Sequence, residues 1–135
     1  MAFDQTTTTQ AKYNALTYLA TGTLKMALYT ASADLNASTT AYTTSGEVVG
    51  TGYAAGGEIL TGVVVSQSGT TAYLSFDNAT WDPASFTARG ALIYNTSLGN
   101  LAIAVLDFGS DKTATTTFTV QMPANTADAA LIRFA

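Results

Sequence analysis

Two aspartates beside the single tryptophan of this chain have the types and spacing best suited to catalysis. Asp77 and Asp82 flank Trp81; glycosidases need only two carboxyl groups, and an indole ring offers a face on which a sugar can stack. Both aspartates stand among Asn and Pro residues, however, where Asp most often shapes a turn. The chain also has no histidine and no cysteine, so the usual general base and the usual thiolate nucleophile are missing. We therefore expect no enzymatic activity.

Two further segments match known motifs only in part. Gly50-Thr-Gly52-Tyr-Ala-Ala55-Gly has the spacing of a relaxed dinucleotide fingerprint, but β-branched residues follow it where a helix should begin. Asp107-Phe-Gly is the magnesium-binding tripeptide of protein kinases, which also requires a catalytic-loop histidine. The glycines indicate a turn or bulge, and Asp107 is expected to end a strand with Gly109 turning the backbone. The calcium-loop pattern is absent too, so we expect no metal and no cofactor.

The composition favours one domain with a sparsely charged surface. Of 135 residues, 47% are hydrophobic and only 10% are charged, and the net charge is −4. A surface with so few charges is poorly protected against association, so we expect other protein to cover part of it. The sequence gives no basic stripe that could follow a phosphate backbone, which argues against direct nucleic-acid binding. The five cations are instead scattered along the chain: Lys12, Lys25, Arg89, Lys112 and Arg133.

The sequence shows no membrane or export signal. No apolar run is long enough to span a bilayer, so we expect no membrane partner. The N-terminal residues lack the basic start and apolar segment of a secretory signal. We expect the protein to be made and folded in a cytoplasm.

The spacing of apolar residues predicts one short helix near the N-terminus. Helical spacing extends over about 8–20, Thr7 and Gln10 have the spacing of a capping box, and Gly22 is a plausible stop. A helix of this length is not stable alone. It must pack either on its own sheet or on a neighbouring subunit.

From Leu24 onward, polar and apolar residues alternate as in half-buried strands. Residues 95–100 suit a hairpin. About eight strands with frequent turn signals predict an all-β fold, an antiparallel β-sandwich or jelly roll of residues 23–135, with residues 1–22 as an arm carrying the short helix. Further predicted strands are Glu47–Tyr53, Glu58–Ser66, Thr71–Phe76, Phe86–Asn95, Leu101–Phe108, Thr115–Met122 and Ala129–Phe134, with a short extended piece at Ala79–Trp81.

The segment Thr30–Gly46 has little regular pattern. Loops of this length are uncommon inside compact domains and are often functional or covered by a partner. The alternative is an additional edge strand near Thr39–Thr44. The sequence leaves both interpretations open.

The aromatic residues divide into two groups. Those inside alternating strands are expected to pack in the core: Tyr73, Phe76, Phe86, Phe108, Phe118 and Phe134. Aromatic residues outside or at the ends of strands, together with two leucines of the predicted helix, are candidates for contact with another subunit, because Tyr and Trp are enriched in interfaces. These candidate interface residues are Tyr13, Leu16, Tyr18, Leu19, Tyr42, Tyr53 and Trp81.

Several segments, in order over about 24–135, resemble a family of small virion proteins of tailed bacteriophages. They are Leu-Lys-Met-Ala-Leu-Tyr-Thr at 24–30, Ala-Ser-Thr-Thr-Ala-Tyr-Thr-Thr-Ser-Gly-Glu-Val at 37–48, Gly-Thr-Gly-Tyr-Ala-Ala-Gly-Gly at 50–57, Ser-Phe-Thr-Ala-Arg-Gly-Ala-Leu-Ile-Tyr-Asn at 85–95, Ala-Val-Leu-Asp-Phe-Gly-Ser-Asp-Lys-Thr at 104–113 and Leu-Ile-Arg-Phe at 131–134. This resemblance implies a β-sandwich on a capsid shell, of the cement or decoration type that is commonly trimeric. It carries over no functional residue.

The leading hypothesis is a non-enzymatic capsid cement protein on the capsid surface of the virion. Its expected partners are the major capsid protein and two further copies of itself in a homotrimer. The alternatives are a receptor- or carbohydrate-binding module of a fibre tip or head fibre, which would use exposed aromatic rings, and a structural component of the neck or tail.

Overall fold

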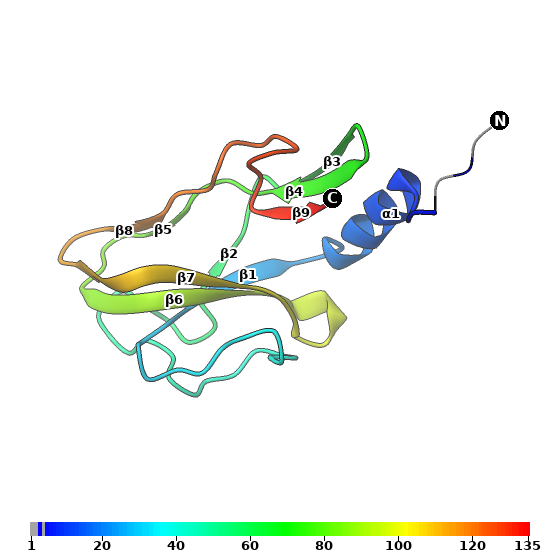
Figure 1. Ribbon diagram of the computed structural model, residues 1–135. Helices are drawn as coiled ribbons and strands as arrows, with labels where there is room; N and C mark the ends of the chain where they lie inside the picture. The colour runs from blue at the N-terminus through cyan, green and yellow to red at the C-terminus, as the bar shows by residue number, and fades with distance from the viewer. Residues whose placement is uncertain (1–2, 4) are drawn as a thin grey trace.

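Nine strands and one α-helix make up the part of the chain that the computed structural model describes, which is Phe3 and residues 5–135 (Figure 1). In chain order the elements are α1 (Thr9–Leu19), β1 (Leu24–Tyr29), β2 (Glu58–Ile59), β3 (Val64–Ser68), β4 (Thr71–Ser75), β5 (Ala79–Trp81), β6 (Phe86–Asn95), the 3-10 helix η1 (Thr96–Leu98), β7 (Leu101–Ala114), β8 (Phe118–Val120) and β9 (Ile132–Phe134).

The antiparallel pairing of all these strands confirms the predicted all-β sandwich with a short N-terminal helix. The finer expectation of a jelly roll stays a prediction. Of the predicted arm, Met1, Ala2 and Asp4 lie outside the described residues.

The strands form two layers. The first layer is a four-stranded sheet in the order β2-β1-β6-β7, and the second consists of a three-stranded sheet, β3-β4-β9, and the pair β5-β8. Figure 1 shows the second layer lying across one face of the first. The core between them is apolar, with Leu28 and Ile93 from the first layer and Leu74 and Phe118 from the second. Burial of these side chains is the main force that holds the two layers together.

The central strands of the first sheet, β1 and β6, are buried on both faces, which the alternating sequence did not predict. Met26 and Leu28 of β1 face the sandwich core, while Ala27 and Tyr29 on the other face are also buried. Residues 30–57 are here called the loop cover (Figure 1). Its residues Ala33, Leu35 and Tyr42 pack on this outer face, and Val48 and Tyr53 further along it pack in the sandwich core. The prediction that the strand starting at Leu24 is half-buried is therefore wrong, because the loop cover adds a third layer over its outer face.

The helix α1 packs on its own sandwich. It contacts β3 and β4, and Leu16 is fully buried in the common core. The helix begins after Thr8, whose side chain accepts a hydrogen bond from the Ala11 N–H, so the predicted capping box of Thr7 and Gln10 is wrong by one residue. Its C-terminal end is held by the buried Asn95, whose Nδ2 donates to the carbonyls of Leu19 and Thr21.

Glycines account for the main errors in strand boundaries. Gly57 and Gly62 have φ values of 80° and 63°, in the left-handed region that ends extended structure, and they delimit a short β2 where one longer strand was predicted. Residues 47–53 form only isolated bridges, at Glu47 and Thr51, instead of a strand. The suspected edge strand in the loop is likewise a single bridge, between Ala41 and Leu101.

Strand β7 is longer than predicted and contains a large bulge. Its register with β6 jumps from Gly90↔Asp107 to Ala88↔Lys112, so residues 108–111 of β7 lie against Arg89 alone. Gly109 has φ 81°, and its N–H donates to the Asp107 side chain at 2.8 Å. The expectation that Asp107 ends the strand is wrong, although Gly109 does turn the backbone there. Bulges of this kind bend a strand and increase its twist.

Candidate interaction surface

The seven predicted interface residues fall into four environments. Leu16 and Trp81 lie in the interior, with 0% and 1% exposure, so their assignment to an interface is wrong: each packs within its own chain. Tyr13 and Leu19 are half-buried against the same core. Tyr18 is 61% exposed and remains available for contact. The two others, Tyr42 and Tyr53, lie together in a hydrogen-bonded cluster.

This tyrosine–glutamate cluster consists of Glu47, Tyr29, Tyr42, Tyr53 and Tyr94. The buried Glu47 Oε1 accepts a hydrogen bond from the Tyr42 hydroxyl at 2.6 Å, and Oε2 accepts one from the Tyr53 hydroxyl. The Gly56 N–H donates to the same Oε2 at 2.8 Å. With three donors, the carboxyl group is held without a cation.

The other two tyrosines extend the cluster over the sheet. Tyr29 donates to the Thr43 carbonyl and Tyr94 to the Gly56 carbonyl, both at 2.7 Å. The rings of Tyr42 and Tyr94 stack with their centroids 4.7 Å apart. Every contact joins the loop cover to itself or to the sheet, so the cluster fixes the loop cover in place.

Burial raises the pKa of all four tyrosines. The pKa of Tyr29 rises from 10.0 to about 12, first because the ring is buried and then because Glu47 is nearby. The pKa values of Tyr42 and Tyr53 also rise, through burial and then through the hydrogen bond to Glu47. Burial likewise raises the pKa of Tyr94. These hydroxyls are therefore donors at neutral pH, and none is poised to act as a base.

We expect the free energy of unfolding to fall as the pH rises above 10. In the unfolded chain, Tyr29 loses its proton near its ordinary pKa of 10.0, whereas in the folded protein it keeps the proton to about pH 12. Its stabilising contribution is thus fully present below pH 10 and is lost between pH 10 and pH 12. The loss from Tyr29 alone is about 1.4 kcal/mol per pH unit in this window.

Urea unfolding followed by circular dichroism from about pH 9 to about pH 12 measures this slope. The matched variant Tyr29→Phe removes the titrating hydroxyl and is expected to show a shallower decline. A free energy of unfolding that stays constant up to pH 12 contradicts the prediction.

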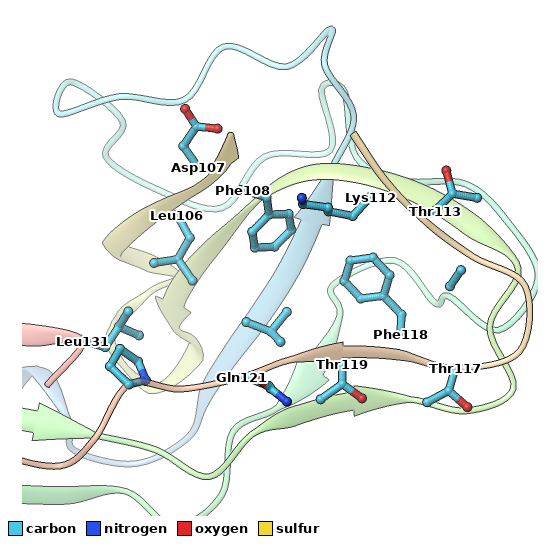
Figure 2. A pocket seen from close by; sticks show the side chains of 13 residues that line it. Leu106, Asp107, Phe108, Lys112, Thr113, Thr117, Phe118, Thr119, Gln121 and Leu131 are labelled. Atoms are coloured by element: carbon cyan, nitrogen blue, oxygen red, sulfur yellow. The ribbon is translucent and has the colours of Figure 1, made fainter. Parts of the chain in front are cut away.

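An apolar groove lies between β7 and β8 (Figure 2). Its volume is about 530 Å³. Figure 2 shows Leu106 and Phe108 reaching into it from β7, with Phe118 facing them from β8. Phe118 is buried, whereas Leu106 and Phe108 are half-buried. Six polar and four apolar residues complete the lining: Asp107, Lys112, Thr113, Thr117, Thr119 and Gln121, with Ala114, Val120, Pro123 and Leu131.

The groove follows from the topology and from the bulge. β7 is the edge strand of the first sheet, so beyond its first residues no described strand pairs with its outer side. The bulge at residues 108–111 bends this edge beside β8. The resulting site has an apolar floor and an unpaired backbone edge, the two features by which sheet edges bind extended protein segments.

The charged groups near the groove do not form a catalytic or metal-binding set. Arg89 Nε lies 3.4 Å from Asp107 Oδ1 on the exposed side of β7. The Gly109 N–H and then Arg89 lower the pKa of Asp107. Within the described part of the chain, no three acidic residues come together as a metal-ion site. Asp77 and Asp82 are exposed, but the Trp81 ring between them is buried and offers no sugar platform.

No protein-family model, curated protein or solved structure matches this chain. Among the described residues, no helix has both the length and the apolar character needed to cross a bilayer.

Sequence reasoning missed both the cluster and the groove. The available signal for the cluster was a lone Glu47 between Tyr42 and Tyr53 in an otherwise uncharged segment. For the groove, alternation correctly placed Phe108 and Phe118 against the core. It gave no sign that β7 and β8 leave a gap between them, because that gap depends on the bulge.

Proposed function

We propose that this chain is a non-enzymatic structural protein of a tailed-bacteriophage virion, a capsid cement protein that binds the major capsid protein and itself. The observation that carries the proposal is the apolar groove at an unpaired sheet edge. Such a surface suits the binding of protein rather than chemistry on a small molecule. The segments over 24–135 that resemble small virion proteins support the same conclusion.

The fixed loop cover supports a mechanical role. Hydrogen bonds from Tyr42 and Gly56 to Glu47 make the loop cover rigid. In a cement protein, a rigid body transmits a load from its contact with one capsid subunit to its contact with the next. Repeated symmetrically over a shell, many weak contacts of this kind add up to a large avidity. In this role each copy would bridge neighbouring capsid subunits and oppose their separation under the pressure of packaged DNA.

The carbohydrate-binding alternative has less support. It depended on Trp81 and Tyr42 as exposed rings, but Trp81 is buried and Tyr42 stacks on Tyr94 and donates to Glu47. The Trp81 ring is therefore closed to a sugar, and one face of the Tyr42 ring is covered by Tyr94.

The test adds purified protein to phage heads prepared without it. We expect saturable binding and a higher temperature of DNA release from the heads. Heads that bind no protein at saturating concentration contradict the proposal.

The contribution of the arm is tested in the same assay with residues 2–7 replaced by a Gly-Ser linker of equal length. A deletion of 2–22 is unsuitable, because it removes the buried Leu16. The shorter change leaves Thr8, which caps α1, in place. Phe3 is 92% exposed, so we expect lower occupancy if this residue contacts the shell. Unchanged occupancy assigns the binding to the sandwich itself.

A further inference from the structure

Two tyrosines from distant parts of the chain stack face to face between the loop cover and the sheet. Tyr42 belongs to the loop cover, and Tyr94 belongs to β6. Their rings lie at an interplanar angle of 21° with the centroids 4.7 Å apart. Tyr94 is buried and Tyr42 is half-buried, so the stack lies just below the surface of the protein.

The hydroxyl ends of the two rings are held at one place. The Tyr42 hydroxyl donates to Glu47 Oε1 at 2.6 Å, and the Tyr94 hydroxyl donates to the Gly56 carbonyl at 2.7 Å. The Gly56 N–H donates in turn to Glu47 Oε2 at 2.8 Å, so the two acceptors are neighbours. The ortho carbons, which are the ring carbons next to each hydroxyl-bearing carbon, are therefore at the same end of the stack.

This arrangement suits the coupling of two tyrosyl radicals. The unpaired electron of such a radical occupies a π orbital with density on the oxygen and on the ortho carbons, so a bond forms when two ring faces meet. Burial raises the pKa of both hydroxyls, so each must lose its proton as its electron leaves. Glu47 already accepts a hydrogen bond from Tyr42 and is placed to receive that proton.

We propose that Tyr42 and Tyr94 form an oxidative cross-linking site, at which a one-electron oxidant joins the two rings through a carbon–carbon bond. Each ring gives one electron to the oxidant and releases its hydroxyl proton to water, in Tyr42 by way of Glu47. One ortho carbon of each radical then bonds to the other, and the hydrogen on each of these carbons moves to the oxygen of its own ring. The product, dityrosine, has two hydrogen atoms fewer than the pair and keeps both hydroxyl groups.

The surroundings favour this pair over other reactions. No other two tyrosine rings stack in the part of the chain that the structure describes. Tyr53 binds the same carboxyl group, but its ring lies against Trp81 and Phe86, with centroids 6.3 Å and 5.8 Å away. The chain has no cysteine, so no thiol competes for the oxidant. The bond would fasten the loop cover to β6, and it does not depend on the capsid role.

The test oxidises the full chain with light, tris(bipyridyl)ruthenium(II) and persulfate, which takes up two electrons and becomes two sulfate ions. A low protein concentration is used, and the monomer is isolated afterwards, because the exposed Tyr18 also permits cross-links between molecules. We expect the monomer to show the fluorescence of dityrosine.

Trypsin digestion locates the bond. Cleavage after Arg89 separates the two tyrosines into the peptides 26–89 and 90–112, and Tyr94 is the one tyrosine of the second peptide. We expect mass spectrometry to find the two peptides joined, with a mass two hydrogen atoms below their sum.

Variants then identify the partner of Tyr94. Tyr42→Phe and Tyr94→Phe each keep a ring in the stack but remove the phenol that forms the radical, so the joined peptide is expected to disappear in both. Tyr29→Phe is the matched control, because it removes a hydroxyl from the same cluster and leaves the stacked pair in place. Circular dichroism checks that each variant folds, and either of the first two suffices if the other does not.

The bond is also expected to stabilise the fold. It closes residues 42–94 into a loop in the unfolded chain, so the unfolding equilibrium constant of the isolated cross-linked monomer should fall about 100-fold. Urea unfolding against the untreated protein measures this change.

Three results overturn the proposed site. The first is an oxidised monomer without the joined peptide, and the second is a joined peptide that persists undiminished in Tyr42→Phe. The third is an equal yield of that peptide when the chain is oxidised above its urea midpoint, since the stack then plays no part in the coupling.

Discussion

Replacing Glu47 with alanine is expected to lower the free energy of unfolding by about 4 kcal/mol. The change leaves the Gly56 N–H without its acceptor and removes the acceptor of the Tyr42 and Tyr53 hydroxyls. Hydrogen bonds to a charged group contribute about 1.5–3 kcal/mol each, and part of the loss is recovered when water reaches the freed hydroxyls. Urea unfolding at neutral pH measures the effect.

Two comparisons make this prediction specific. Glu58→Ala changes the same residue type on an exposed strand and is expected to alter stability by less than about 0.5 kcal/mol. Hydrogen exchange in Glu47→Ala is expected to rise first in the loop cover, at amides such as that of Thr30, which donates to the Gly46 carbonyl. Equal stability of the two alanine variants contradicts the role given to the cluster.

The second large effect is expected for Trp81→Ala, at about 3 kcal/mol of lost stability. The Trp81 ring packs against Phe118 and Tyr53, with ring centroids 6.0 Å and 6.3 Å away. Truncation leaves a cavity between the layers. The loss of stability is expected at the lower end of the range for a tryptophan-to-alanine change. The Trp81 indole N–H is buried without a hydrogen-bond partner among the described residues, so its removal also removes an unfavourable desolvation free energy.

The matched variant Trp81→Phe keeps an aromatic ring and removes the unpartnered N–H. We expect it to cost about 1 kcal/mol or less. Both values come from chemical unfolding followed by far-ultraviolet circular dichroism, since the chain has no other tryptophan to report fluorescence. A Trp81→Ala protein as stable as the unaltered chain would place the ring at the surface and contradict the assignment to the core.

The elements that local pattern controls were predictable from the sequence. β6 spans Phe86–Asn95 as predicted, because its apolar run and the turn residues after it agree. The helix over 9–19 was also predicted to within a residue at each end. In both cases the residues that decide the structure are neighbours in the chain.

What the sequence could not supply depends on contacts between distant residues. Trp81 stands in a short segment next to Pro83 and was predicted to be near the surface, but pairing of β5 with β8 carries it inward. The loop cover has no regular polar and apolar alternation from which its position could be predicted. Hydrogen bonds from Tyr29 and Tyr94 on the sheet fix that position instead. The groove requires both an edge strand and a bulge. Gly109 marked a turn of the backbone at the bulge, but nothing in the sequence marked β7 as an edge strand.

The bulge in β7 has a consequence for the behaviour of this protein at high concentration. A long, straight outer strand would accept another strand along its full length, and copies could then stack without limit into fibrils. The four residues opposite Arg89, which include Asp111 beside Lys112, interrupt that edge with a bend and with charge. Straightening this segment by deletion is therefore expected to make the protein precipitate as cross-β aggregates.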